Sequence, residues 1–159
     1  MLAALADLGI AKSIHEHEAV FTVEASAKLH DEIAGAHTKN LFLKDASSQF
    51  WLVTAPHDAK VDLKALPLAI GSKKLSFGKS EDMERMLCVT PGSVTPLAAF
   101  NDVHGEVKVV IDARLATQTC VNVHPLRNTA TISLSGQKLI EFLEQHQHTP
   151  LIVELQALQ

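Results

Sequence analysis

The sequence contains no tyrosine, and aromatic residues make up only 4% of its 159 residues. So few rings argue against an extended stacking platform for single-stranded RNA. No apolar run reaches the roughly 18 residues that a membrane span needs, and the first residues lack the basic segment of a signal peptide. We therefore expect neither a membrane protein nor a secreted one.

Cysteine is equally scarce, with only Cys88 and Cys120 in the whole chain. Neither has the partner of a C-x-x-C motif, and two cysteines do not make a disulfide framework. Each lies within an apolar segment, where a thiol usually fills space and does not react. We expect a reduced, cytoplasmic setting and no cysteine nucleophile.

Common catalytic signatures are also missing. No glycine-rich phosphate loop follows an expected strand, and no serine lies in a G-x-S-x-G elbow. Nine histidines suggest a metal site, yet H-E-x-x-H is absent. The pairs His15/His17 and His146/His148 have no third ligand at a characteristic spacing, which favours structural histidines. We expect no metal, no other cofactor and no protein nucleophile.

The composition that remains is that of a folded chain, with 47% hydrophobic and 20% charged residues. Its length suits one domain, so we assign residues 1–159 to a single domain. A formal net charge of −4 does not by itself indicate a nucleic-acid-binding protein.

The charge is unevenly distributed along the chain. Residues 1–38 hold two lysines and six acidic residues, whereas residues 60–80 hold five lysines and one aspartate. The lysine-rich middle is either a phosphate-facing patch or an ordinary solvated surface. Together with Lys44, the candidates are Lys60, Lys64, Lys73, Lys74 and Lys79.

Apolar periodicity predicts about seven strands and four or five helices in mixed order. The clearest signal is a hairpin, because apolar runs at 40–43 and 50–53 flank a polar segment. Both runs are continuous, so we expect strands that are buried on both faces. A second hairpin region is expected over 107–134, and the two together favour an antiparallel or mixed sheet.

The remaining expected elements follow from shorter patterns. Further strands are expected at 13–23, 75–77 and 151–155. Helices are expected at 2–8 and 24–34, and at 63–70 with a distortion from Pro67. Helix caps are expected at Asp62, Ser80 and Ser135.

Three features are not explained by packing. Lys39 stands before a buried strand, where a lysine is either a snorkelling strand end or a cation placed at a cleft. The loop at 92–96 combines glycine freedom with proline stiffness, which is typical of loops that hold main-chain groups against a ligand. The segment 124–129 places a histidine, an asparagine and a threonine at the end of one strand.

These features occur together as K-N-L-F-L at 39–43, G-S-V-T-P at 92–96 and H-P-L-R-N-T at 124–129. In order and spacing, across nearly the whole chain, they resemble the YbaK/prolyl-tRNA-synthetase editing-domain family, and most closely its freestanding alanyl-tRNA(Pro) deacylase branch. The resemblance implies an α/β fold of the α+β type, in which an antiparallel or mixed β-barrel-like sheet is surrounded by helices.

The resemblance also implies an enzyme, a carboxylic ester hydrolase that deacylates mischarged alanyl-tRNA(Pro) in trans. Such an enzyme spares prolyl-tRNA(Pro) because proline is too large for the pocket. The residues implied as catalytic are Lys39 and His124. The residues implied to line the substrate pocket are Asn40, Gly92, Ser93, Val94, Thr95, Pro96 and Asn128.

The implied partner is the acceptor end of a tRNA(Pro) that carries a wrong amino acid, with no DNA and no membrane partner. The six lysines then become candidates for phosphate contacts. Two alternatives stay open: a deacylase for another amino acid, such as cysteine on tRNA(Pro), and a non-catalytic aminoacyl-tRNA-binding module. A partnership with prolyl-tRNA synthetase or an elongation factor also stays open.

Overall fold

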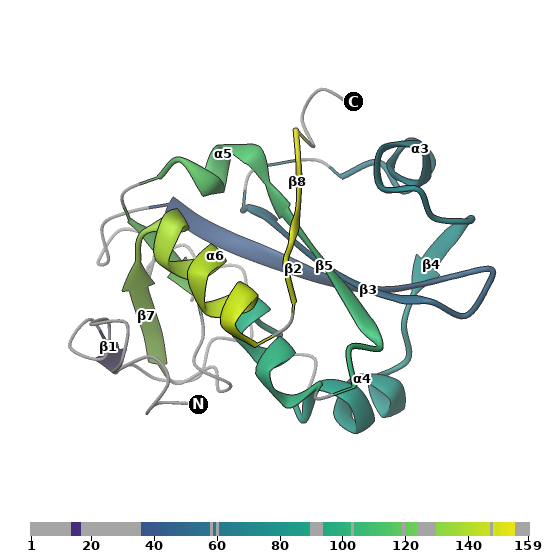
Figure 1. Ribbon diagram of the computed structural model, residues 1–159, viewed down its shortest axis with the longest axis horizontal. Coiled ribbons are helices and arrows are strands. Elements are labelled where there is room, and N and C mark those ends of the chain that lie inside the picture. Colours follow the sequence, from purple (N-terminus) through teal and green to yellow (C-terminus); the bar gives the residue numbers. More distant parts are fainter. Residues whose placement is uncertain are drawn as a thin grey trace.

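A mixed sheet of eight strands organises the protein, which we describe from a computed structural model (Figure 1). The structure describes residues 14–16, 36–57, 59, 61–89, 94–102, 104–118, 120–123, 130–146 and 148–154. The strands are β1 (Ile14–Glu16), β2 (Ala36–Asp45), β3 (Phe50–Pro56), β4 (Leu75–Phe77), β5 (Val107–Asp112), β6 (Val121–Val123), β7 (Ala130–Leu134) and β8 (Leu151–Val153). The described helices are α3 (Leu66–Ile70), α4 (Ser80–Leu87), the 3-10 helix η3 (Pro96–Asn101), α5 (Ala113–Ala116) and α6 (Gly136–Gln145).

The strand order is β1-β7-β6-β2-β3-β5-β8, and β4 adds a further pairing to β2. Three pairs are parallel (β2/β6, β3/β5 and β5/β8), and the other pairs are antiparallel. This confirms the predicted α/β fold with a mixed sheet. The barrel-like closure is wrong, because β1 and β8 end the order and these two strands do not pair with each other.

The predicted hairpin of β2 and β3 is confirmed, with Lys44 opposite Phe50 at the turn and Thr38 opposite Pro56 at the far end. Every residue of β3 is buried, as its continuous apolar run predicts. In Figure 1 the hairpin extends to the right, where β4 lies beside it. The hairpin is therefore the long central element of the sheet.

The second predicted hairpin region is only partly correct. β6 and β7 pair antiparallel as expected, but β5 pairs in parallel with β3 and β8. The reason is α5, which begins directly after β5 with Asp112 accepting from the Arg114 N–H at 2.8 Å. This turn takes the chain away from β5, and the next strand joins β2 instead.

Two apolar clusters cover opposite faces of the hairpin, because side chains alternate along each strand. One face packs Leu43, Trp51 and Val53 with α3, and the other packs Phe42, Phe50 and Leu52 with α4 and η3. A third cluster joins β5, β6 and β7 to η3, α5 and α6. The hairpin is thus held from both sides, which fixes the positions of its polar residues.

Of the predicted helix caps, only Ser135 is confirmed, since its hydroxyl accepts from the Lys138 N–H at 3.0 Å. Ser80 is the first residue of α4 and Lys79 is its N-cap, because Lys79 has the extended backbone of a cap. Asp62 binds the Lys64 N–H in the turn before α3 and does not cap the helix. Pro67 lies in the first turn of α3, where a missing N–H costs nothing, so it starts the helix and does not distort it.

The expected N-terminal elements fall largely outside the described residues. Of the strand expected at 13–23, the structure describes Ile14–Glu16 as β1. The helices expected at 2–8 and 24–34 lie outside the described residues. Within the part of the chain that the structure describes, no helix is long and apolar enough to cross a membrane.

Candidate functional site

One edge of β2 is the centre of the candidate site. On the edge opposite β3, β6 pairs with the first two residues of β2 and β4 with its last three. No described strand pairs there with residues 38–42, and we call this stretch the open edge. The Gly78 N–H donates to the Phe42 carbonyl at 2.8 Å, so the main-chain groups of Phe42 point to this edge. By strand alternation, the N–H and C=O of Asn40 point to it as well.

The side chain of Asn40 connects three segments of the chain. Its amide nitrogen donates to the Val94 carbonyl at 3.1 Å, and its oxygen accepts from the Thr54 hydroxyl at 2.6 Å. Thr54 is fully buried and lies directly opposite Asn40 in the hairpin. Because a carbonyl only accepts, the Val94 carbonyl requires the amide nitrogen to face it, and the Thr54 hydroxyl then donates to the amide oxygen.

The described part of the predicted pocket loop is buried and ordered by its own polar groups. Val94, Thr95 and Pro96 are all buried, and Pro96 begins η3. The Thr95 hydroxyl accepts from the Leu97 N–H at 3.4 Å, and the Thr95 carbonyl accepts from the Ala98 N–H at 3.1 Å. This half of the loop is therefore fixed to the end of a helix, while Gly92 and Ser93 lie outside the described residues.

Lys39 lies on the other face of the hairpin from Asn40. Its side chain points to the face of Leu43 and Trp51, and its ammonium donates to the carbonyl of Ala59, a buried residue of the same cluster. An ammonium has three N–H donors, so this bond takes one and leaves two. The resemblance assigns Lys39 and the pocket loop to one site. In the structure they lie on opposite faces of the hairpin, at the same open edge.

At the other end of the open edge, β6 is held to the start of β2. The Thr38 hydroxyl donates to the Asn122 carbonyl at 2.8 Å, and the Ser133 hydroxyl donates to the Asn122 side-chain oxygen at 2.6 Å. β6 runs parallel to β2 and ends at Val123. The two predicted residues that follow, His124 and Asn128, lie outside the described residues.

The predicted lysines lie around the far end of the hairpin. Lys64, Lys73, Lys74 and Lys79 are exposed, on segments that flank α3 and β4. Lys44 is half-buried, with its ammonium 5.6 Å from the centre of the Phe50 ring. Lys60 lies outside the described residues.

Asp45 joins the tip of the hairpin to the lysine-rich segment. One carboxylate oxygen accepts from the Ser47 N–H and hydroxyl and from the Gln49 N–H; the other accepts from the Trp51 ring N–H and the Lys73 N–H. Burial alone would raise the pKa of Asp45, but these hydrogen bonds outweigh it and lower the pKa to about 2. The ionised carboxylate therefore holds the loop before β4 against β2.

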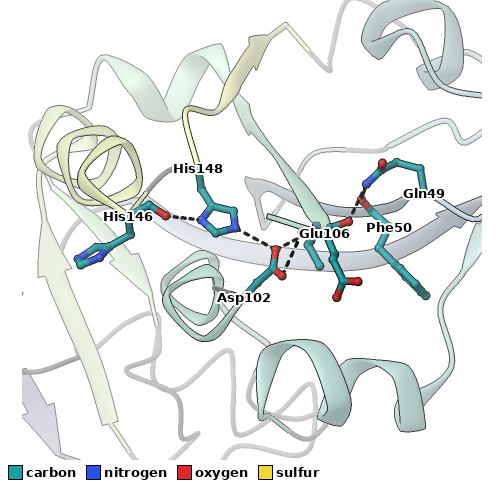
Figure 2. Close-up of polar contacts among 7 residues, drawn as sticks. Gln49, Phe50, Asp102, Glu106, His146 and His148 are labelled. Atoms are coloured by element: carbon teal, nitrogen blue, oxygen red, sulfur yellow. Dashed lines mark hydrogen bonds and ion pairs between the residues drawn. The ribbon is translucent and has the colours of Figure 1, made fainter. Parts of the chain in front are cut away.

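A buried ion pair holds the end of η3 to the C-terminal part of the chain (Figure 2). The His148 ring bonds the His146 carbonyl through Nδ1 at 2.7 Å and Asp102 through Nε2 at 2.9 Å. A carbonyl only accepts, and Asp102 also accepts from the N–H groups of Glu106 and Val107, as a carboxylate does. Both ring nitrogens of His148 therefore donate, which makes the contact an imidazolium–carboxylate pair.

This arrangement agrees with the structural interpretation of the pair His146/His148. The His146 ring packs edge-on against Phe100, with ring centres 4.7 Å apart. Burial and the nearby charge of His148 both lower the pKa of His146. Among the described residues no three histidine, cysteine or acidic side chains are grouped as metal ligands would be.

A half-open cavity of about 420 Å³ lies beyond β5, away from the open edge of β2. Its lining includes Trp51, Lys108, His148 and Leu151, and none of the residues predicted for the site. His148 is already committed to its ion pair. The cavity therefore does not coincide with the candidate site.

Thr54, Thr38 and Asn122 were not predicted as site residues. Thr54 follows four apolar residues of β3, where threonine is an ordinary strand former. One signal was available, because the turn between Asp45 and Phe50 sets a register that places Thr54 opposite Asn40. The contact of Thr38 with Asn122 joins residues 84 positions apart, and no local pattern indicates it.

The family of the chain follows from comparison with known proteins. Residues 17–142 match the profile of the Aminoacyl-tRNA editing domain family, so the chain belongs to that family of hydrolases acting on misacylated tRNA. The resemblance inferred from the three motifs is confirmed.

Two curated relatives cover nearly the whole chain. The Prolyl-tRNA editing protein ProX of Acetoanaerobium sticklandii is 40% identical over 156 residues, 98% of this chain and 95% of that protein. The Prolyl-tRNA synthetase associated domain-containing protein 1 of Xenopus laevis is 39% identical over 158 residues, 96% of this chain and 94% of that protein.

Solved structures agree on the fold. The hypothetical protein APE2540 superposes with a TM-score of 0.74 at 16% identity, covering 95% of both chains. A candidate trans-editing enzyme for prolyl tRNA synthetase superposes with a TM-score of 0.69 at 16% identity, covering 94% of this chain and 91% of that one. At this level of identity the likeness establishes the fold alone.

Proposed function

We propose that the chain is a trans-editing deacylase that hydrolyses the ester of mischarged alanyl-tRNA(Pro) and spares prolyl-tRNA(Pro). The observation that carries the proposal is the 40% identity to the Prolyl-tRNA editing protein ProX across 98% of the chain. The motif at 39–43 and the rigid anchoring of the loop that ends at Pro96 support it.

The physical reason for such an enzyme lies in the limits of binding selectivity. A synthetase pocket built for proline does not strongly exclude alanine, because each missing methylene is worth only about 1–3 kcal/mol. A second pocket that is too small for proline removes the error by steric exclusion. Exclusion requires a rigid wall, and the buried segment from Val94 to Pro96 has the packing to provide one.

We assign roles at the open edge on chemical grounds. The two remaining N–H donors of Lys39 would bind the terminal phosphate or ribose, or the ester oxygen as negative charge develops on it. The main chain at Asn40 and Val94 would contact the aminoacyl group. His124 would bind the ribose or orient a water, and Asn128 would fix that turn. Water, aided by the ribose hydroxyl next to the ester, would attack the carbonyl.

The exposed lysines Lys64, Lys73, Lys74 and Lys79 would contact acceptor-stem phosphates, together with Lys44 and Lys60. Such contacts supply affinity without reading sequence and weaken with added salt. Their local charge is opposite to that of the RNA, although the chain as a whole is acidic.

A deacylation panel tests the proposal. Alanyl-, cysteinyl- and seryl-tRNA(Pro) are incubated with the wild-type chain and with Lys39→Ala, after both are compared by circular dichroism. We expect rapid loss of alanine, slower loss of the others, and no activity in Lys39→Ala. Preferred release of cysteine would favour the other substrate, and tight binding without release would favour a binding module.

A further inference from the structure

Phe77 is the one aromatic side chain that is mostly exposed among the described residues. Its exposed fraction is 67%, whereas those of Phe42, Phe50 and Trp51 are 7% or less. A single exposed apolar residue needs no explanation by itself. What distinguishes Phe77 is its position, its rigidity and the charge around it.

Phe77 borders the open edge of β2. It is the last residue of β4 and lies opposite Leu43, so its side chain points to the same face of the sheet as Leu43 and Lys39. Lys39 and Leu43 are four positions apart, which is about 13 Å along a strand. The ring and the Lys39 ammonium therefore lie on one face, at two ends of the same open edge.

The main chain that carries Phe77 is firmly held. The Gly78 N–H donates to the Phe42 carbonyl at 2.8 Å, and a Cβ atom on Gly78 would lie 2.3 Å from the Phe42 ring. Only glycine therefore permits β4 to approach β2 this closely. The hydroxyl of Ser76 adds a 3.4 Å bond to the Lys44 carbonyl. A ring on so fixed a backbone binds a partner with little loss of conformational entropy.

The charge around the ring is mainly positive in sequence, with one acidic residue, Glu81, within four positions of Phe77. Residues 63–80 contain four lysines and no acidic residue. Lys73, Lys74 and Lys79 are all exposed and lie within four positions of Phe77. A ring face among cations is the arrangement that proteins use for unpaired nucleotides, where bases stack and phosphates are neutralised. A protein partner of ordinary composition would not need this concentration of positive charge.

We propose that Phe77 is a stacking platform for one unpaired nucleobase of the tRNA 3′ end, with Lys73, Lys74 and Lys79 at the adjoining phosphates. The inference rests on the proposed function, because it takes the ester to lie beside Lys39 at the other end of the open edge. It also refines the expectation from composition: a chain poor in aromatic residues lacks an extended platform but can present one ring.

The test uses two uncharged tRNA(Pro) molecules, one complete and one lacking all of the unpaired 3′ nucleotides. Binding of each to wild type, Phe77→Ala, Phe77→Leu and Phe77→Trp is measured by fluorescence anisotropy. Ile152→Ala is the control, because Ile152 is 45% exposed on β8, at the far end of the sheet. Circular dichroism and thermal unfolding check that each variant is folded.

We expect wild type to bind the complete tRNA more tightly than the truncated one. Phe77→Ala and Phe77→Leu should bind the complete tRNA about tenfold more weakly than wild type, which is within the range of one stacked base, and should bind the truncated tRNA as wild type does. Phe77→Trp should bind as wild type or better. Equal binding of both tRNAs by wild type, or unchanged binding by Phe77→Leu, would overturn the platform. The platform would also be overturned if the wild type were a dimer and Phe77→Ala made it a monomer without changing its affinity for RNA.

The proposed function can fail separately from the platform. If wild type deacylates alanyl-tRNA(Pro) and Phe77→Ala does so with the same KM and kcat, only the platform is contradicted. If wild type deacylates none of the panel but shows the Phe77-dependent preference for the complete 3′ end, the chain is a binding module and the platform stands.

Discussion

The hydroxyl of Thr54 donates a 2.6 Å hydrogen bond to the side-chain oxygen of Asn40, while the Asn40 amide nitrogen donates to the carbonyl of Val94. Thr54 is fully buried in β3, and Asn40 is half-buried. A residue with no predicted part in the site therefore helps to hold Asn40 against the loop that ends at Pro96.

Thr54→Val should impair catalysis and stability together. The substitution keeps the side-chain shape but leaves the Asn40 oxygen unsatisfied, which costs about 1–3 kcal/mol in unfolding free energy. Because Asn40 loses its orientation, we expect kcat to fall about tenfold with a smaller change in KM. Urea unfolding and single-turnover deacylation measure the two effects.

Thr54→Ser separates positioning from packing in this experiment. Serine retains the hydroxyl and removes only a methyl group, so activity should return even if some stability is lost. An inactive Thr54→Ser, or a fully active Thr54→Val, would contradict the positioning role.

Replacing Lys73 and Lys74 together with glutamine should weaken tRNA binding. Each lost phosphate contact lowers the slope of log K against log salt by about 0.9 on duplex and about 0.7 on a single strand. Binding is measured from 50 to 300 mM salt, with Lys108→Gln as the control because Lys108 is exposed on β5. The same affinity and slope in the double variant and in Lys108→Gln would remove Lys73 and Lys74 from the interface.

Asp45→Asn should destabilise the fold in a pH-dependent way. The pKa of Asp45 is lowered from its ordinary value of 3.8 to about 2, so the folded state favours the charged form. Its contribution is complete above pH 3.8 and is lost as the pH falls through about 2. We expect the variant to be less stable at pH 7 by about 1–3 kcal/mol, with the gap narrowing toward pH 2. A gap in urea unfolding that is constant with pH would rule out this account.

Asp102→Asn should strongly destabilise the protein, because it leaves the buried His148 imidazolium without its counter-charge. Breaking such a pair from one side costs about 3–5 kcal/mol. His148→Gln and the double variant complete a cycle by thermal unfolding. If the pair is strong, the double variant loses much less stability than the sum of the losses in the two single variants. If the losses are additive, the two residues are not coupled.

The sequence was sufficient for the parts of the fold that depend on local pattern. The continuous apolar runs at 40–43 and 50–53 predict a buried hairpin, and Ser135 precedes a helix in the usual way. The prediction of Ser80 as a cap was wrong, because either Lys79 or Ser80 can precede the helix and only the backbone conformation decides between them.

The candidate site was predictable as a set of motifs but not as an arrangement. Strand alternation already implies that Lys39 and Asn40 point to opposite faces. Which residues of β2 lack a partner among the described strands depends on its pairing with β4 and β6, and those strands are distant in sequence. The importance of Thr54 likewise emerges only from contacts across the sheet.

The most direct test of the account compares the hydrolysis of alanyl-tRNA(Pro) and prolyl-tRNA(Pro) by the wild-type chain under single-turnover conditions. We expect alanine to be released about a hundredfold faster than proline, since proline is excluded from the pocket by size. Equal rates for the two substrates, or no hydrolysis of alanyl-tRNA(Pro) by a folded protein that binds it, would contradict the central claim.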